Sequence, residues 1–252
     1  MQVGKLLYAT DSREPDFSGV KALLDLKNLG LMEFIFLHAT RVQGWGTRLA
    51  EYDITSKTVM MEGPVVPSIL NAAHREGAPL IAASLNRDTR RLMRGSLTTA
   101  LLRASALPVL MVPEEAQGSG FGQHGVFTRI VFAADWSAAS EKAMGYILNF
   151  KDIIKELEIV HVIDRKLSVR DMGKLKEALS KTRDVFLDHG IDAEAHVYAG
   201  KPFEEIMLAA RDYDATCICM GTAGKSFVKG LLSRSCACRV AETSVVPTLV
   251  VP

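Results

Sequence analysis

One segment of the sequence combines residue types that bind anions. It follows a short apolar run, begins at Met220 and Gly221, contains Gly224 and ends at Ser235. Glycines in such a loop let backbone N–H groups approach a phosphate, and a helix that starts at Ser235 adds the positive end of its dipole. The same glycines also suit an ordinary turn, so the pattern alone leaves an anion-binding loop and a plain turn as alternatives.

The four cysteines raise the question of a zinc site, but their spacing argues against one. Cys217 and Cys219 lie on a predicted strand and share a face, whereas Cys236 and Cys238 lie on a predicted helix, about 200° apart. Four sulfur atoms do not readily converge on one ion from these positions, so we interpret the cysteines as small buried apolar residues. No Walker, Ser-His-Asp or Cys-His pattern is present, so we expect no catalysis beyond slow hydrolysis of a bound ligand.

The composition excludes several classes of protein. The chain has 252 residues, 48% hydrophobic and 23% charged, which excludes wholesale disorder. Its formal net charge of +1 provides no general field for holding nucleic acid. No apolar run approaches the roughly 18 residues of a membrane span, and the N-terminal apolar stretch is too short for a signal peptide. We therefore expect a cytoplasmic protein without membrane or nucleic-acid partners.

The sequence repeats itself in four blocks that keep the same order, which predicts two homologous domains. The first domain spans 1–113 and the second 127–252, with a Gly-rich polar linker over 114–126. Between its second and third blocks the first domain has 14 residues fewer, so we expect it to be one helix short. The matched blocks are Lys5–Asp11 with Arg129–Asp135, Phe34–His38 with Leu157–His161, Gly63–Ser84 with Gly200–Gly221, and Ser96–Pro113 with Ser235–Pro252.

Strands and helices alternate in the second domain, which predicts a mostly parallel sheet. Ligands of such sheets bind beyond the carboxyl ends of the strands, where Asp135 lies in the second domain and Asp11 in the first. We expect strands over Ile130–Ala134, Leu157–Val162, Ala193–Tyr198, Thr216–Met220 and Thr248–Val251. We expect helices after Ser137, from the capping pair Ser168 and Asp171 to Gly190, from Pro202, and over Ser235–Glu242.

Four features together resemble the universal stress protein family. They are the strand-end Asp135, the Gly200-x-Pro202 turn, the Gly221-x-x-Gly224 loop and the closing segment Val246–Val251. The resemblance covers almost the whole chain, twice. It implies an α/β fold of two tandem Rossmann-like domains, each with a mostly parallel five-stranded sheet flanked by helices. It also implies a stress-response binding module that holds ATP or another adenine nucleotide, with Mg²⁺ accompanying the nucleotide.

The resemblance also implies which residues form the site in the second domain. Nucleotide-binding members carry G-x-x-G, nine residues, and then Gly-Ser or Gly-Thr; here Arg234 stands in place of the third glycine. In those members the strand-end Asp recognises the ribose or adenine side, and the backbone at the position of Val162 meets the adenine. The expected site comprises Ala133, Asp135, Val162, Met220, Gly221, Gly224, Arg234, Ser235 and Cys236.

The Arg234 side chain has two opposite interpretations. It either clamps a phosphate or fills the space that a phosphate needs, and we favour the second, with adenosine or a shorter phosphate chain tolerated better than ATP. In the first domain the loop from Ser84 to Ser96 lacks both leading glycines, so we expect no triphosphate there. The alternative function is a family member that has lost ATP binding and acts through protein partners or another small ligand.

Two short apolar runs, Val109–Val112 and Thr248–Val251, lie between prolines and read as edge strands. Exposed apolar edges favour pairing. We therefore expect these strands to pair antiparallel, so that the two domains form an intramolecular pseudo-dimer, with a homodimer of whole chains as a further association. Trp45 and Trp136 could pack over the strand ends, and Trp136 could stack on a base, but we favour packing at the contact between the domains.

Overall fold

The computed structural model of the chain describes residues 3–10, 17–38, 44–84, 96–113, 125–164, 166, 168–222 and 236–252. The first half contains β1 (Lys5–Thr10), α1 (Ser18–Lys21), the 3-10 helix η1 (Leu24–Leu29), β2 (Glu33–His38), α2 (Trp45–Ala50), β3 (Thr55–Met60), α3 (Val65–Glu76), β4 (Ile81–Ser84), α4 (Leu97–Ala104) and β5 (Val109–Met111). The second half contains β6 (Arg129–Ala133), α5 (Ala138–Ile147), the 3-10 helix η4 (Leu148–Phe150), β7 (Glu156–Ile163), α6 (Val169–Asp188), β8 (Ala193–Ala199), α7 (Pro202–Asp212), β9 (Cys217–Gly221), α8 (Cys236–Thr243) and β10 (Thr248–Val251). None of these described helices is both long and apolar enough to cross a bilayer.

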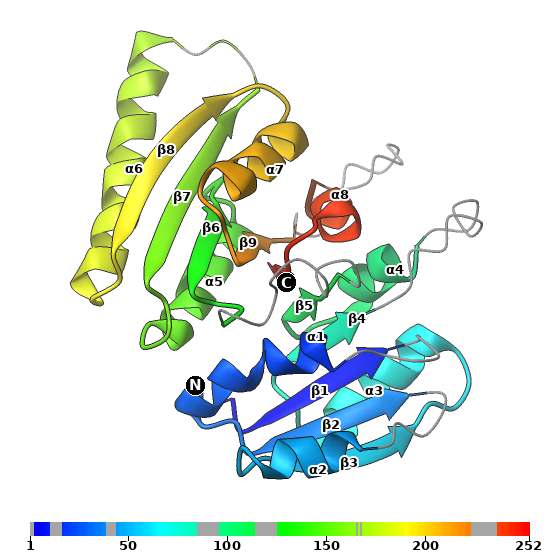
Figure 1. The fold of residues 1–252 in the computed structure, drawn as a ribbon. Coiled ribbons are helices and arrows are strands. Elements are labelled where there is room, and N and C mark those ends of the chain that lie inside the picture. The colour runs from blue at the N-terminus through cyan, green and yellow to red at the C-terminus, as the bar shows by residue number, and fades with distance from the viewer. Residues whose placement is uncertain are drawn as a thin grey trace.

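The ten strands form one continuous sheet (Figure 1) in the order β3-β2-β1-β4-β5-β10-β9-β6-β7-β8. Each half contributes five strands in the same relative order, so the internal repeat of the sequence is also a repeat of the fold. All neighbouring strands pair parallel except β5 and β10, which pair antiparallel where the two halves meet. The expected α/β fold of two tandem domains is confirmed.

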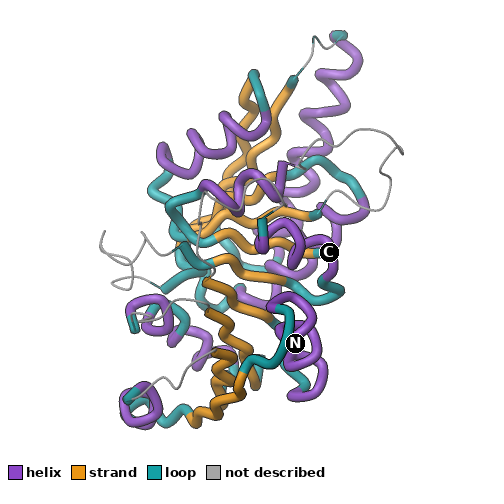
Figure 2. Tube along the Cα trace, turned by 90° about the vertical axis from the view of Figure 1, so that its right-hand side faces the viewer, coloured by secondary structure: helices purple, strands orange, loops and turns teal. Residues whose placement is uncertain are grey.

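Helices cover both faces of the sheet, as the edge-on view shows (Figure 2). One core cluster holds buried side chains of α1, α2, α5 and α6, and the other holds those of α3, α4, α7 and α8. Successive strand residues serve opposite faces: in β6, Ile130 and Phe132 belong to the first cluster and Val131 to the second. This double coverage explains why central strands such as β1, β6 and β9 read as apolar runs.

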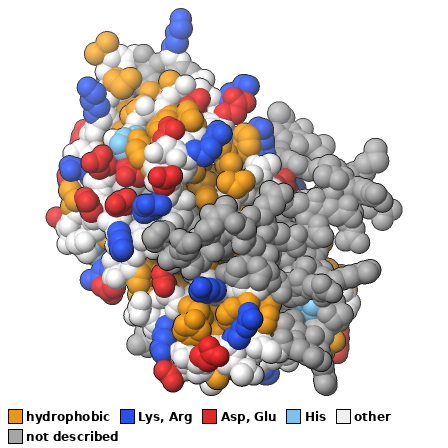
Figure 3. Space-filling view, in the orientation of Figure 1, with side chains coloured by type: hydrophobic (Ala, Val, Ile, Leu, Met, Phe, Trp, Pro, Cys, Tyr) orange, Lys and Arg blue, Asp and Glu red, His pale blue; other side chains and the backbone are white. Residues whose placement is uncertain are grey.

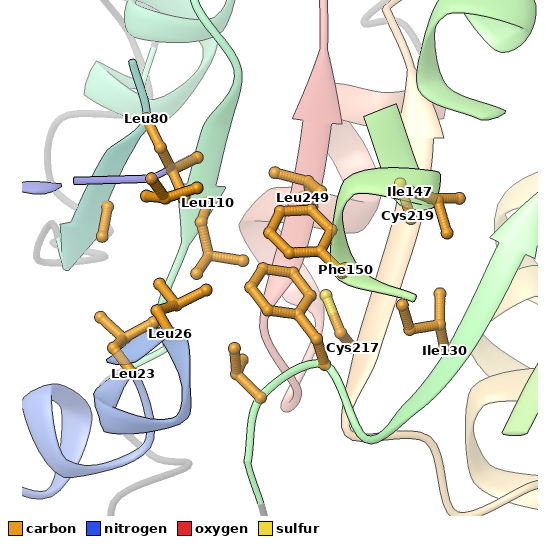
Figure 4. Packing of buried hydrophobic residues seen from close by; sticks show 14 of the residues in the cluster. Leu23, Leu26, Leu80, Leu110, Ile130, Ile147, Phe150, Cys217, Cys219 and Leu249 are labelled. Atoms are coloured by element: carbon orange, nitrogen blue, oxygen red, sulfur yellow. The ribbon is translucent and has the colours of Figure 1, made fainter. Parts of the chain in front are cut away.

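The core is continuous across the border between the two halves. Val109 pairs with Val250, and Leu110 pairs with Leu249, in the antiparallel register of β5 and β10. The side chains of Leu110, Leu249 and Phe150 lie in one cluster that also includes leucines of η1 (Figure 4). The expected antiparallel pairing of these two strands is therefore confirmed. At the end of the segment expected as a linker, Val126 is buried and donates its N–H to the Ala22 carbonyl of the first half; residues 114–124 lie outside the described part.

The local sequence signals of the second half fall where they were expected. Ser137 caps α5 by accepting a hydrogen bond from the Ser140 N–H, and Ser168 caps α6 in the same way from Asp171. Gly190 follows α6 with a left-handed φ of 80°, a conformation in which glycine avoids the strain of a side chain.

The first half differs from expectation in its second crossover, because a helix is present there. α2 has 6 residues and α6 has 20, so the 14 residues that the first half lacks shorten this helix without removing it. Trp45 of α2 is buried against the rings of Tyr8, Phe17 and Phe36, at centroid distances of 5.0 to 6.1 Å. The expectation that Trp45 packs at the contact between the domains is therefore wrong, because it covers the sheet of its own half.

Candidate functional site

A cleft of about 470 Å³ lies at the carboxyl ends of β6, β7 and β9, between the first turns of α7 and α8. In this half β6 lies between β7 and β9, so the strand order reverses at the carboxyl end of β6. Open α/β sheets bind ligands at such a switch point. The described residues that line the cleft are Ala133, Ala134, Asp135, Val160, His161, Val162, Ile163, Asp164, Pro202, Ile206, Met220, Gly221 and Cys236.

Six of the nine residues expected from the sequence line this one cleft: Ala133, Asp135, Val162, Met220, Gly221 and Cys236. The other three, Gly224, Arg234 and Ser235, lie outside the described residues. The site expected from the sequence did not include Asp164 or His161, which both line the cleft. The signal for Asp164 was its place directly after an apolar strand, the same signal that identified Asp135.

Asp135 is exposed and lines the cleft, two residues after the end of β6. Its Oδ1 accepts a hydrogen bond from the Ser137 N–H at 3.0 Å, and its own N–H donates to Ser140 Oγ at 3.3 Å. These bonds tie the residue to the start of α5 and fix one carboxylate oxygen. A carboxylate has a second oxygen with further lone pairs, so Asp135 retains acceptors for the hydroxyl groups of a sugar.

The rings of His161 and Trp136 pack against each other close to Asp135. The His161 Nδ1 lies 2.8 Å from the carbonyl oxygen of Ala134, and because a carbonyl oxygen only accepts, this nitrogen carries the proton. The two rings are 4.7 Å apart at 38°, and Trp136 Nε1 donates to Thr182 Oγ1 at 3.0 Å. Trp136 holds a left-handed φ of 54°, which these contacts stabilise. Trp136 thus packs within its own half, contrary to the expected packing between domains.

The backbone of Val162 is directed into the cleft. The carbonyl of Val160 accepts a hydrogen bond from the Ala134 N–H at 2.9 Å, so the backbone groups of Val160 face β6. Backbone direction along a strand repeats every second residue. Val162 therefore aims its N–H and C=O past the end of β6, whose last ladder partner on β7 is Val160. One donor beside one acceptor suits the edge of adenine, which offers a ring nitrogen and an amino group.

Gly221 lets the start of α5 approach the end of β9. A Cβ added at Gly221 would lie 2.4 Å from the carbonyl carbon of Ala139 and 2.6 Å from the Ser140 nitrogen, closer than real atoms come. Both contacts are with backbone, which cannot swing aside as a side chain does. The structure thus gives Gly221 a packing role that holds whether or not a ligand binds.

Cys236 is the first residue of α8 and lines the cleft. Burial raises the pKa of its thiol to about 11, with the neighbouring Asp135 carboxylate acting in the same direction and Arg239 opposing it. Asp135 and Cys236 both line the cleft, so the start of α8 borders the same space as the end of β6.

The other cysteines are core residues. Burial raises the pKa of the Cys217 thiol to about 12 and raises that of Cys219 well above its ordinary value. Cys217 and Cys219 belong to the cluster on one face of the sheet and Cys238 to the cluster on the other, so the four sulfur atoms do not surround one point.

The counterpart helix start in the first half already holds a carboxylate. Ser96 caps α4 by accepting from the Thr99 N–H at 3.0 Å, and its hydroxyl donates to a carboxylate oxygen of Glu242 on α8. The Thr99 hydroxyl donates to the same oxygen at 2.6 Å. An anionic side chain of the second half therefore lies at the positive end of α4, at the serine that matches Ser235 in the repeat.

Comparisons with known proteins assign the second half of the chain to a family. The profile of the family described as "Universal stress protein family" matches residues 127–252, half of the chain. "Universal stress protein MJ0577" of Methanocaldococcus jannaschii is 27% identical over 154 residues, covering 50% of this chain and 95% of its own length.

The solved structures extend the likeness to the whole fold. A crystal structure of a universal stress protein from Archaeoglobus fulgidus DSM 4304 matches with a TM-score of 0.77 at 21% identity, covering 99% of this chain and 96% of its own. Another universal stress protein structure, from Archaeoglobus fulgidus in complex with dAMP, matches at 20% identity and a TM-score of 0.41, covering 50% of this chain and 99% of its own.

Proposed function

Because the chain belongs to the universal stress protein family, we propose that its second domain is a binding module for an adenine nucleotide, held in the cleft at the ends of β6, β7 and β9. The observation that carries the proposal is the convergence of Asp135, the backbone of Val162 and Gly221 on one cleft. Val162 meets the adenine edge, Asp135 accepts from the ribose hydroxyls, and the phosphates extend toward the start of α8.

The charges of the described part of the cleft favour a ligand with few phosphates. Among the described lining residues the charged side chains are the carboxylates Asp135 and Asp164, and no lysine or arginine is among them. Carboxylates suit the neutral ribose but repel a long phosphate chain. We therefore propose that adenosine or AMP binds at least as tightly as ATP, and that Mg²⁺ joins only a ligand with two or more phosphates.

One site per chain follows from the difference between the two domains. Glu242 already supplies a carboxylate to the start of α4, so a phosphate there would meet a like charge. The paired edge strands would make the chain a pseudo-dimer with a single working nucleotide site, and whole chains would associate further into a homodimer.

Mass spectrometry of small molecules released from the purified protein tests the proposal. We expect adenosine or an adenine nucleotide in the released fraction. The D135N variant, purified in parallel, should release markedly less of it. A released ligand that lacks adenine would contradict the proposal and favour a family member that binds another small ligand.

A further inference from the structure

A cluster outside the nucleotide cleft brings one histidine and two glutamates together. Glu158 of β7 and Glu194 of β8 are direct partners in the parallel register, and His196 follows two residues along β8 on the same face. His196 Nε2 lies 2.6 Å from Glu158 Oε2 and 3.9 Å from Glu194 Oε2. Each of the three residues has one possible ligand atom, and these three atoms all lie within 4.8 Å of one another. Glu158 lies two residues before Val160, the nearest lining residue of the cleft on β7, which is roughly 7 Å along the strand.

The two glutamates repel each other unless a cation lies between them. Like charges directly opposite on neighbouring strands are destabilising. In the described part of the chain, the only ion-pair partner of either carboxylate is His196. The side chains of Glu158 and His196 are only 17% and 23% exposed, so water screens this pair weakly, whereas Glu194 is 71% exposed. Even a protonated His196 would leave one negative charge uncompensated.

The imidazole of His196 is held in place by an aromatic neighbour. The Tyr213 ring, at the end of α7, stacks on His196 with centroids 4.7 Å apart at 29°. The stacking restricts the ring, so its Nε2 stays directed at the carboxylates. Fixed ligands reduce the entropy that is lost when an ion binds.

We propose that Glu158, Glu194 and His196 form a binding site for a divalent first-row transition metal ion of the Zn²⁺ type. One imidazole nitrogen with two carboxylate oxygens suits such ions, and Mg²⁺ prefers oxygen ligands alone. Ligands of a tetrahedral Zn²⁺ at about 2.0–2.1 Å are roughly 3.4 Å apart. The distances from His196 Nε2 to the Glu158 and Glu194 carboxylate oxygens, 2.6 and 3.9 Å, lie on either side of that value. Small side-chain shifts would therefore admit the ion. Water completes the coordination, and the ion joins the edge strand β8 to β7.

The test is calorimetric titration of ZnCl₂ into tag-free, chelator-treated, full-length protein, in parallel with the same titration of MgCl₂. We expect one Zn²⁺ site that H196Q and E194Q each weaken at least tenfold. The exposed residues His74 and Glu141 lie outside the cluster, so H74Q and E141Q serve as matched controls and should leave the affinity unchanged. Zn²⁺ should also raise the Tm of the wild-type protein and of both controls more than that of E194Q.

Three results would overturn the site. Zn²⁺ affinities of H196Q and E194Q within twofold of the controls would show that His196 only neutralises Glu158 as an ion pair. Equal affinity for Mg²⁺ would exclude the transition-metal assignment. The absence of Zn²⁺ binding to the wild-type chain would exclude the site altogether. If H196Q fails to fold because the stack on Tyr213 is lost, E194Q still decides the question, since that side chain is largely exposed.

Discussion

Asp135 allows the cleft to be tested by changing one atom. Asparagine keeps an oxygen that can accept from the Ser137 N–H and removes the charge that faces the ligand. We expect D135N to bind AMP about tenfold or more weakly, because a hydrogen bond to a charged group contributes about 1.5–3 kcal/mol. Calorimetry measures the change, with D184N on the exposed side of α6 as the matched control. Equal affinity of D135N and D184N would remove Asp135 from the site.

Arg234 stands where the family resemblance leads us to expect a glycine, and it lies outside the described residues. If its side chain fills the space of a phosphate, R234G should raise the affinity for ATP and change that for AMP much less. A clamping arginine gives the opposite result, a fall in ATP affinity of roughly tenfold or more. Titration of R234G with both nucleotides separates these cases. We expect the rise, and a fall would contradict occlusion.

The Cys236 thiol reports on the cleft through its pH dependence. Burial raises its pKa to about 11, so the reactive thiolate is scarce at neutral pH and increases about tenfold per pH unit up to that value. We expect slow alkylation at pH 7.5, faster alkylation at pH 9, and slower alkylation at either pH once AMP fills the cleft. The other three cysteines are buried, so C236S should show little labelling of the native protein. Labelling that AMP does not slow would place the ligand elsewhere.

At the scale of elements, the packing of α5 on β9 depends on Gly221. A methyl group there meets the backbone of Ala139 and Ser140, so G221A must push the helix away from the strand. We expect the free energy of unfolding to fall by about 1–3 kcal/mol, as measured by urea denaturation. In the same helix, a methyl group at Gly145 would have no atom within 4 Å. We therefore expect G145A to raise the free energy of unfolding by roughly 0.5–1 kcal/mol. A G221A variant as stable as wild type would contradict the close approach.

The elements also show which parts of the fold could be predicted from sequence. Buried strands produce apolar runs, and the caps Ser137 and Ser168 act locally, so both were predicted to within a residue or two. α2 was missed because its only buried side chains are Trp45 and Leu49, too few to show a helical period. The glutamate and histidine cluster was missed because it depends on the register of two strands, which a single strand does not reveal.

At the scale of the whole molecule, two similar halves share one sheet and differ at their loops. The prolines around β5 and β10 and the apolar runs between them were enough to predict how the halves join. The contact of Glu242 with Ser96 and Thr99 was not predicted, because it links residues more than 140 positions apart. On the face drawn in Figure 3, the acidic and basic side chains of the described residues are interspersed, in keeping with a net charge of +1. The two halves therefore differ in the length of their second crossover helix, α2 against α6, and in the Glu242 carboxylate at the start of α4.

Calorimetric titration of the whole chain with AMP tests most directly whether one adenine nucleotide binds per chain, in the second domain. We predict a stoichiometry of one, an affinity for AMP at least equal to that for ATP, and an AMP affinity about tenfold or more lower in D135N. A stoichiometry of two would show that the first domain also binds, despite the Glu242 carboxylate at its helix start. The absence of binding by AMP, adenosine and ATP alike would contradict the nucleotide-binding function.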